Sequence, residues 1–144
     1  MSKMFYSGKK LMLLLIFCIS GLFSFGQKNI VIVTGTDYIS HMTFSQLLAI
    51  YNGNITEIES GPISFLDHEQ KTQIYKDFVK QYFNLTPEQM QQYWEKMKID
   101  KGKRPPKFLP DGLLSKAIPT IKGSISYYYE DAVPAGLRVI KVNR

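Results

Sequence analysis

Two kinds of hydrophobic pattern alternate along this chain. Short β-branched runs without polar alternation, such as Asn-Ile-Val-Ile-Val-Thr at 29–34, are typical of strands buried on both faces of a sheet. Longer stretches repeat their apolar residues every three or four positions, which indicates amphipathic helices. Strands are predicted at 29–34, 63–66, 124–129 and 137–142, and helices at 44–51, 69–83, 87–98 and 111–118. This order predicts an α/β domain, a three-layer sandwich with a mixed sheet.

Local sequence signals mark where helices begin and where they cannot form. Thr43 precedes an apolar helical face and has Gln46 three residues later, which is the pattern of a capping box. Thr86 followed by Pro87 is a second strong helix start. Residues 101–110 contain three prolines and a glycine, so they are predicted to form a loop.

The first 26 residues are predicted to be an export signal. Three lysines and no acid give a positive start, residues 11–25 are mostly apolar, and Ser24 and Gly26 suit a peptidase site. The apolar run is shorter than the roughly 20 residues that a membrane-spanning helix needs, so a cleaved signal is favoured over an uncleaved anchor. Residues 27–144 are then expected to form one domain, located in the periplasm or secreted.

Charge and cysteine content exclude several classes of function. The formal net charge is +6, and without the three lysines of the predicted signal it falls to about +3. Such a mild charge, with no basic arm, does not indicate nucleic-acid binding. The only cysteine, Cys18, lies within the signal, where the bulky Phe17 before it disfavours lipid attachment. A mature chain without a thiol has no disulfide framework, thiolate metal site or cysteine nucleophile.

Four short motifs follow one another in the mature chain. They are Leu47-x-x-Ile50-Tyr51-x-Gly53, Trp94, Gly102-Lys103-x-Pro105-Pro106 and Gly123-x-Ile125-Ser126-Tyr127. Their order and spacing resemble those of phosphate ABC transporter-type substrate-binding proteins, relatives of one lobe of the type 2 periplasmic binding proteins. Ser126 replaces the second glycine of the family pattern. The resemblance implies the fold of one lobe of such a protein.

Two departures from the family affect the function that the resemblance implies. Full-length relatives clamp phosphate between two lobes, and this chain has length for one. The relatives also carry an Arg and then a Ser-Gly-Thr turn after the second strand, where a helix N-terminus and a bidentate donor favour an anion. Residues 67–72 here read Asp-His-Glu-Gln-Lys-Thr. Asp67 and Glu69 would repel an anion, so phosphate binding is not expected to carry over.

Eight residues are predicted to contact a ligand. Loops that leave buried strands gather at one end of an open sheet, and helix N-termini point there, so three segments are expected to form a single ligand-binding edge. The residues are Thr34, Gly35 and Thr36 after the first strand, His68, Lys71 and Thr72 after the second, and Lys103 and Arg104 in the proline-rich loop. Each segment also has a structural interpretation: a turn, the capped start of a helix, and a solvated loop.

Two further clusters are better explained by structure than by chemistry. Asp67, His68 and Glu69 could bind a cation or act in acid-base chemistry, but the sequence favours Asp67 as a helix cap with the other two in the first turn. His41 lies apart from them, and no metal-ligand spacing is present. The tyrosines at 127–129 are expected to alternate between the faces of a strand, each with its hydroxyl at the edge of the core.

These observations predict an exported, non-enzymatic binding protein that captures a small solute, with an anion as one candidate. The alternative is an envelope protein-interaction module that keeps the lobe but has lost phosphate binding. The expected partner is the solute or an envelope protein, with a transporter or a second lobe as candidates. No catalytic residue, metal, cofactor or nucleic-acid partner is expected. After signal cleavage, the chain is not expected to be an integral membrane protein.

Overall fold

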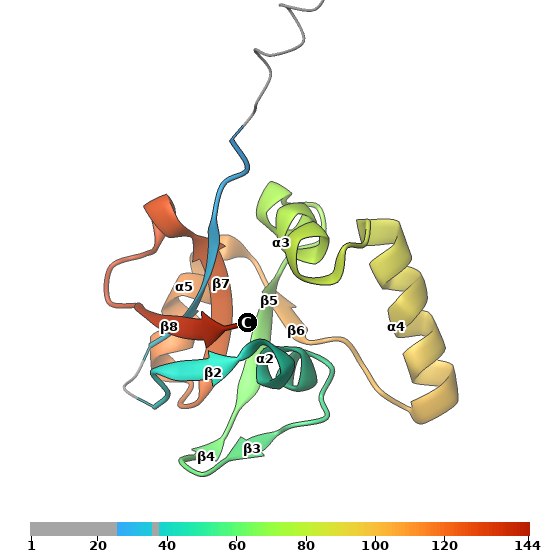
Figure 1. Cartoon of the computed structure of the whole chain (residues 1–144), viewed down its shortest axis with the longest axis horizontal. Helices are drawn as coiled ribbons and strands as arrows, with labels where there is room; N and C mark the ends of the chain where they lie inside the picture. The colour runs from blue at the N-terminus through green and yellow to red at the C-terminus, as the bar shows by residue number, and fades with distance from the viewer. Residues whose placement is uncertain (1–25, 36–37) are drawn as a thin grey trace, which may run out of the picture.

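The fold is built on a six-stranded mixed sheet (Figure 1). The computed structural model describes residues 26–35 and 38–144. A separate small hairpin joins β3 (Glu57–Ile58) to β4 (Gly61–Pro62). The strands of the main sheet, in spatial order, are β2 (His41–Thr43), β8 (Arg138–Asn143), β1 (Ile30–Thr34), β7 (Ser124–Tyr129), β5 (Ser64–His68) and β6 (Lys107–Leu109).

One strand of the main sheet runs against the other five. β1 is antiparallel to both of its neighbours, β7 and β8. The pairs β5–β7, β5–β6 and β2–β8 are all parallel. The carboxyl ends of these five strands therefore share one edge of the sheet, called here the carboxyl edge. The carboxyl end of β1, at Thr34, lies at the opposite edge.

Helices cover both faces of the sheet and complete three layers. Tyr51 and Phe78, from the first two helices, pack against Phe65 of β5 on one face. Asp111, at the start of the last helix, contacts His68 of β5 on the other face, because residues 65 and 68 point to opposite sides of the strand. The helices are α2 (Phe44–Tyr51), α3 (Gln73–Phe83), α4 (Pro87–Lys101) and α5 (Asp111–Thr120), with a 3-10 turn η1 (Glu130–Ala132). The predicted α/β fold class is confirmed.

An aromatic cluster fills the space between the sheet and α2, α3 and α4. Tyr51 lies edge-on to Phe65, with ring centroids 4.9 Å apart, and 6.0 Å from the ring of Trp94. Phe78 stacks on Tyr127 at 3.8 Å, with the ring planes inclined by 10°. All five rings are buried. Burying an aromatic side chain of this kind contributes about 1.5–3 kcal/mol, so the cluster holds three helices onto one face.

Several helices begin where capping residues in the sequence predict that they begin. Thr43 and Gln46 exchange hydrogen bonds between side chain and backbone, which completes the capping box of α2. Thr86 and Gln89 do the same at the start of α4. α4 continues three residues beyond its predicted end and stops at Gly102, whose φ of 63° is the left-handed conformation that glycine accepts readily.

Other predicted boundaries are wrong because pairing between distant segments decides them. β6 forms inside the predicted loop, where Lys107–Leu109 pairs in parallel with β5. β5 itself continues to His68, so α3 begins at Gln73 rather than at residue 69. The short strand β2 has too few residues to show a periodic pattern and forms by pairing with β8.

Two predictions concern the membrane: an export signal at residues 1–26, and a mature chain that does not span the bilayer. Within residues 26–35 and 38–144, no helix combines the length and apolar character needed to cross a bilayer. The predicted signal lies outside the described residues, apart from Gly26.

Candidate functional site

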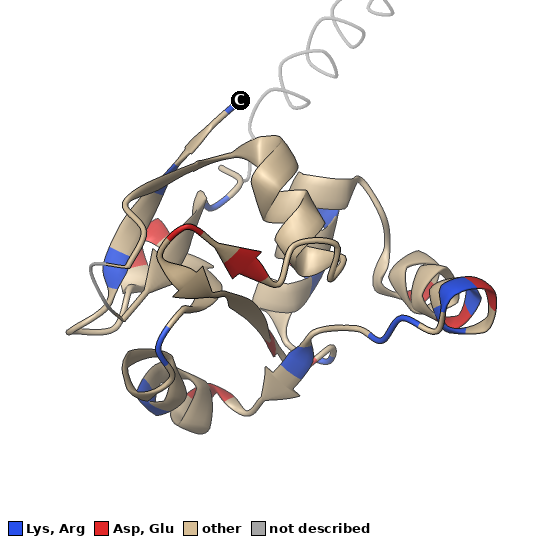
Figure 2. Cartoon of the chain, turned by 90° about the horizontal axis from the view of Figure 1, so that it is seen from below, with Lys and Arg blue, Asp and Glu red and all other residues tan. Residues whose placement is uncertain are grey.

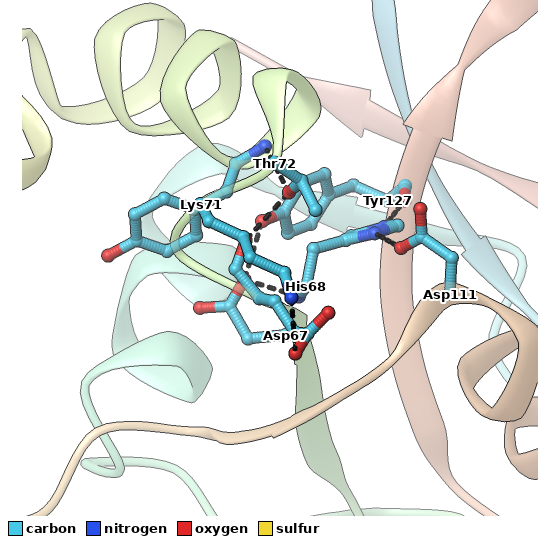
Figure 3. Close-up of polar contacts among 8 residues, drawn as sticks. Asp67, His68, Lys71, Thr72, Asp111 and Tyr127 are labelled. Atoms are coloured by element: carbon cyan, nitrogen blue, oxygen red, sulfur yellow. Dashed lines mark hydrogen bonds and ion pairs between the residues drawn. The ribbon is translucent and has the colours of Figure 1, made fainter.

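The carboxyl edge is the part of this sheet where a binding site is expected. Helices α2, α3 and α5 begin at or shortly after the ends of β2, β5 and β6. Backbone N–H groups at helix N-termini favour negative or polar ligands. The side chains between the end of β5 and the start of α3 therefore decide what this edge can do (Figure 3).

Asp67 is buried at the end of β5, and internal hydrogen bonds use its carboxylate. The Tyr51 hydroxyl donates to Oδ2 at 2.9 Å, and the Tyr127 hydroxyl donates to Oδ1 at 2.5 Å. The backbone N–H of His68 also donates to Oδ1, at 2.9 Å. Because Asp67 is only 4% exposed, a ligand at the carboxyl edge does not reach this carboxylate without opening the core.

Burial dominates the electrostatics of this network. It raises the pKa of Asp67 to about 6, although the hydrogen bonds from Tyr127, Tyr51 and the His68 backbone and the nearby His68 ring all act to lower it. Burial, followed by the negative charge of Asp67, raises the pKa values of Tyr51 and Tyr127 well above the usual range. Both hydroxyls therefore remain protonated and serve as donors at neutral pH.

His68 is held by acceptors on both ring nitrogens. Its Nε2 lies 2.7 Å from the backbone carbonyl oxygen of Tyr127, and its Nδ1 lies 2.7 Å from Asp111 Oδ1. Both ring nitrogens therefore have an oxygen partner within hydrogen-bond distance. The ring ties β5 to β7 and to the start of α5. It has no ring nitrogen left for a ligand.

The next residues of this segment lie at or near the surface. Thr72 caps α3: its Oγ1 accepts from the Tyr75 backbone N–H and donates to the Glu69 carbonyl oxygen at 2.7 Å. The Lys71 side chain is 79% exposed, and its Nζ lies 3.6 Å from Glu69 Oε1. Lys71 is therefore well placed to meet a ligand at the start of α3, whereas Thr72 has a structural task.

The predicted helix-cap role of Asp67 is wrong. β5 runs two residues further than the apolar run suggests, because Asp67 pairs with Phe108 and His68 with Leu109 of β6. Thr72 is then the first residue free to cap a helix. The partners of Asp67 could not be found from local sequence, since Tyr51 and Tyr127 lie 16 and 60 positions away.

The three consecutive tyrosines of β7 alternate as predicted. Tyr127 and Tyr129 face α3, and Tyr129 donates its hydroxyl to Asp77 at 2.6 Å. Tyr128 faces the other side, edge-on to His68. The expected place of the Tyr127 hydroxyl at the edge of the core is wrong, because this hydroxyl is buried in the carboxylate network described above.

Thr34 and Gly35 lie at the edge opposite the end of β5. This follows from the direction of β1, which is antiparallel to the sheet around it. Thr34 donates its hydroxyl to the Ser124 carbonyl oxygen at 3.0 Å, and Gly35 packs against Pro119 of α5. Both residues thus make internal contacts. The third predicted residue of this segment, Thr36, lies outside the described residues.

Replacing Gly35 with alanine is expected to lower the free energy of unfolding by about 1–3 kcal/mol, the usual cost of overpacking. A Cβ at this position would lie 2.3 Å from Pro119 Cα and 2.8 Å from the Ile118 carbonyl oxygen. Urea denaturation measures the change. Gly112→Ala in α5 is the control, since its Cβ would meet open space, and it should be neutral or slightly stabilising. Unchanged stability in the Gly35 variant would contradict the packing role.

Lys103 and Arg104 also lie away from the end of β5. They precede β6, which is parallel to β5, so they lie toward the amino ends of both strands. Lys103 Nζ donates to Asn54 Oδ1. Arg104 lines a shallow hollow together with Ile63 and Ser64 at the start of β5. The predicted single ligand-binding edge is therefore wrong: its residues divide between opposite ends of the sheet.

The described residues offer no arrangement suited to a metal ion. Across 26–35 and 38–144, no three His, Cys, Asp or Glu side chains lie close enough together to hold one. His41 Nδ1 lies 3.1 Å from Ser40 Oγ, and His68 has both ring nitrogens engaged.

A similar arrangement of sheet and helices occurs in part of the solved structures of an ABC-type phosphate transport receptor and of PstS. No protein-family model and no curated protein sequence matches this chain. The structure is similar to an ABC-type phosphate transport receptor from Vibrio cholerae, with a TM-score of 0.62 and 12% identity, over 80% of this chain and 46% of that chain. It is also similar to PstS from Borrelia burgdorferi, with a TM-score of 0.58 and 16% identity, over 81% of this chain and 47% of that chain.

The fold is that of one lobe of a type 2 periplasmic binding protein. At such low identity the likeness shows the fold alone, and the chain spans about half the length of these proteins. In this chain, the carboxyl edge presents Lys71, Glu69 and Asp111 near the starts of α3 and α5.

Proposed function

We propose that this type 2 lobe is a non-enzymatic binding protein of the cell envelope that holds a small solute at its carboxyl edge. The observation that carries the proposal is the exposed Lys71 ammonium beside the start of α3, at the edge where five strands end. The likeness to phosphate transport receptors supports a binding role. The predicted signal at residues 1–26 supports an envelope location.

The charges at this edge favour a polar solute with few charges. Lys71 is positive, but the side chains of Glu69 and Asp111 remain 28% and 61% exposed. A multiply charged anion would meet both carboxylates as well as the lysine, and close like charges are unfavourable. A neutral polar solute or a monoanion fits this mixture better.

Phosphate is therefore expected to bind weakly, with a Kd in the millimolar range, or not at all. The Arg and the Ser-Gly-Thr turn of the resembling family are absent from 67–72, and Asp67 is engaged internally. Isothermal titration calorimetry with inorganic phosphate tests this expectation. Micromolar or tighter binding would show that the anion site lies elsewhere on the lobe.

A melting-temperature screen tests the proposed solute role itself. The panel contains neutral sugars, amino acids, monocarboxylates, sulfate and phosphate. We expect at least one of the less charged solutes to raise the melting temperature of the wild-type protein, and Lys71→Ala to reduce that rise. Lys76→Ala is the matched control, because Lys76 is an exposed lysine further along α3. No rise with any solute, or an equal loss in both variants, would count against the proposal.

The interaction module is a second candidate, favoured by a different observation. The carboxylate and imidazole at the end of β5 are occupied by internal partners. A groove lined by basic residues lies instead on the flank of the sheet. A docking role for that groove is compatible with solute binding at the carboxyl edge.

A further inference from the structure

A groove runs along the flank of the domain between α4 and the segment that leads into β6. It has a volume of about 570 Å³ and is lined by Lys98, Arg104, Pro105, Pro106, Lys107 and Phe108. A smaller hollow beside it shares Lys98 and Pro105 and reaches Trp94 of α4. In Figure 1, α4 stands to one side of the sheet, and the connection to β6 crosses the space between them.

The basic side chains of the groove form no ion pairs with other residues of the described chain. Lys98, Arg104 and Lys107 all have exposed side chains. Figure 2 shows blue segments along the connection and in β6, and blue segments mixed with red ones on α4. No acidic residue lines the groove itself, and one, Glu95, lines the smaller hollow beside it. Like charges gathered without partners favour an acidic ligand.

The groove also has apolar surface suited to a side chain of a partner. Phe108 is 58% exposed, although it is a large aromatic residue. Pro105 and Pro106 add rigid apolar surface, which loses little conformational freedom when a ligand binds. β6 is the outermost strand of the sheet, paired with β5 on one side only. Exposed aromatic and Arg side chains together are typical of protein-interaction surfaces.

We propose that this groove docks an acidic segment of a partner protein, with an apolar side chain of that segment packed on Phe108 and the two prolines. Its carboxylates pair with Lys98, Arg104 and Lys107. The mixture of apolar surface and spaced cations fits a peptide better than a single small anion, which would leave Phe108 uncovered. The docking surface involves different residues from the solute site at Lys71, so either role can fail without the other.

Fluorescence anisotropy with labelled acidic peptides tests the docking proposal. The probes are nine-residue peptides that place one Phe, Leu or Trp among glutamates, together with counterparts in which glutamine replaces every glutamate. We expect saturable binding of an acidic peptide that weakens with salt. Changing Lys98, Arg104 and Lys107 together to serine should weaken it at least tenfold, and Phe108→Ser should weaken it severalfold.

The matched control changes Lys76, Lys116 and Lys141 together to serine, which removes the same charge from exposed positions elsewhere. This control should retain most of the binding, and the melting temperature of each variant confirms its folding. A single-stranded oligonucleotide of equal charge should bind more weakly than the peptide. No peptide binding, an equal loss in both triple variants, or tighter oligonucleotide binding would each overturn the proposal.

Discussion

Replacing Asp67 with leucine is expected to lower the free energy of unfolding by about 3 kcal/mol or more. The change leaves the hydroxyls of Tyr51 and Tyr127 and the backbone N–H of His68 buried without their acceptor. Each buried donor that loses its partner costs roughly 1–3 kcal/mol. Removing the buried carboxylate also removes the cost of keeping it away from water, but this gain offsets only part of the loss. Urea denaturation at pH 7 measures the difference from wild type.

A triple variant separates the hydrogen bonds from the packing at this site. Asp67→Leu combined with Tyr51→Phe and Tyr127→Phe removes the acceptor and two of its donors together. It should recover most of the stability lost in the single variant, because only the His68 backbone N–H is still left without its acceptor, and replacing hydrogen-bonded partners with apolar groups of similar shape is often nearly neutral. A triple variant as unstable as Asp67→Leu would show that the loss comes from packing.

The same network predicts a pH dependence of stability. The pKa of Asp67 is raised from 3.8 to about 6, so the folded protein holds this proton more tightly than the unfolded chain. The stability from this group is present below about pH 4 and is lost as the pH rises through about 6. The difference between these two pKa values of Asp67 corresponds to a free energy on the order of 3 kcal/mol. The wild type should lose about this free energy of unfolding between pH 4 and pH 7, and the triple variant, which lacks Asp67, should not. The difference in stability between the two proteins should therefore change with pH, and a constant difference would contradict the raised pKa of Asp67.

Gly123→Ala is expected to destabilise the domain by about 2–5 kcal/mol. Its φ of 77° is left-handed, which costs a residue with a Cβ roughly 1–2 kcal/mol. A Cβ there would also lie 2.0 Å from the Pro62 carbonyl oxygen, and overpacking adds about 1–3 kcal/mol. The clash is with backbone, and the Gly123 carbonyl oxygen accepts from the Ser64 N–H at 3.0 Å, so neither segment moves freely. Thermal or urea unfolding measures the loss.

Gly136→Ala isolates the conformational part of this effect. Gly136 has a φ of 86°, close to that of Gly123, but a Cβ there would meet nothing within 4 Å. The Gly136→Ala variant should lose only the free energy of unfolding that a left-handed backbone conformation costs a residue with a Cβ, roughly 1–2 kcal/mol. Equal losses at both glycines would mean that the contact with Pro62 has no energetic role.

The sequence was sufficient to predict those elements whose conformation depends on residues close together in the chain. The buried strand at 29–34 follows from its unbroken β-branched run. The capping box at Thr43 follows from Gln46 three positions later, and the helix start at Thr86 follows from an N-cap threonine before Pro87. The alternation of the tyrosines in β7 follows from the two-residue repeat of a strand. In each case, the interacting groups lie within a few residues of one another.

The tertiary structure alone decided the candidate site. Pairing with β6 extends β5 through His68, so Asp67 becomes a buried acceptor instead of a helix cap. The reversed direction of β1 places Thr34 and Gly35 at the far edge, away from Lys71. Strand direction and pairing depend on contacts between segments tens of residues apart, which no local pattern records. The sequence by itself therefore determined the elements and the fold class, whereas packing between distant elements determined which side chains meet.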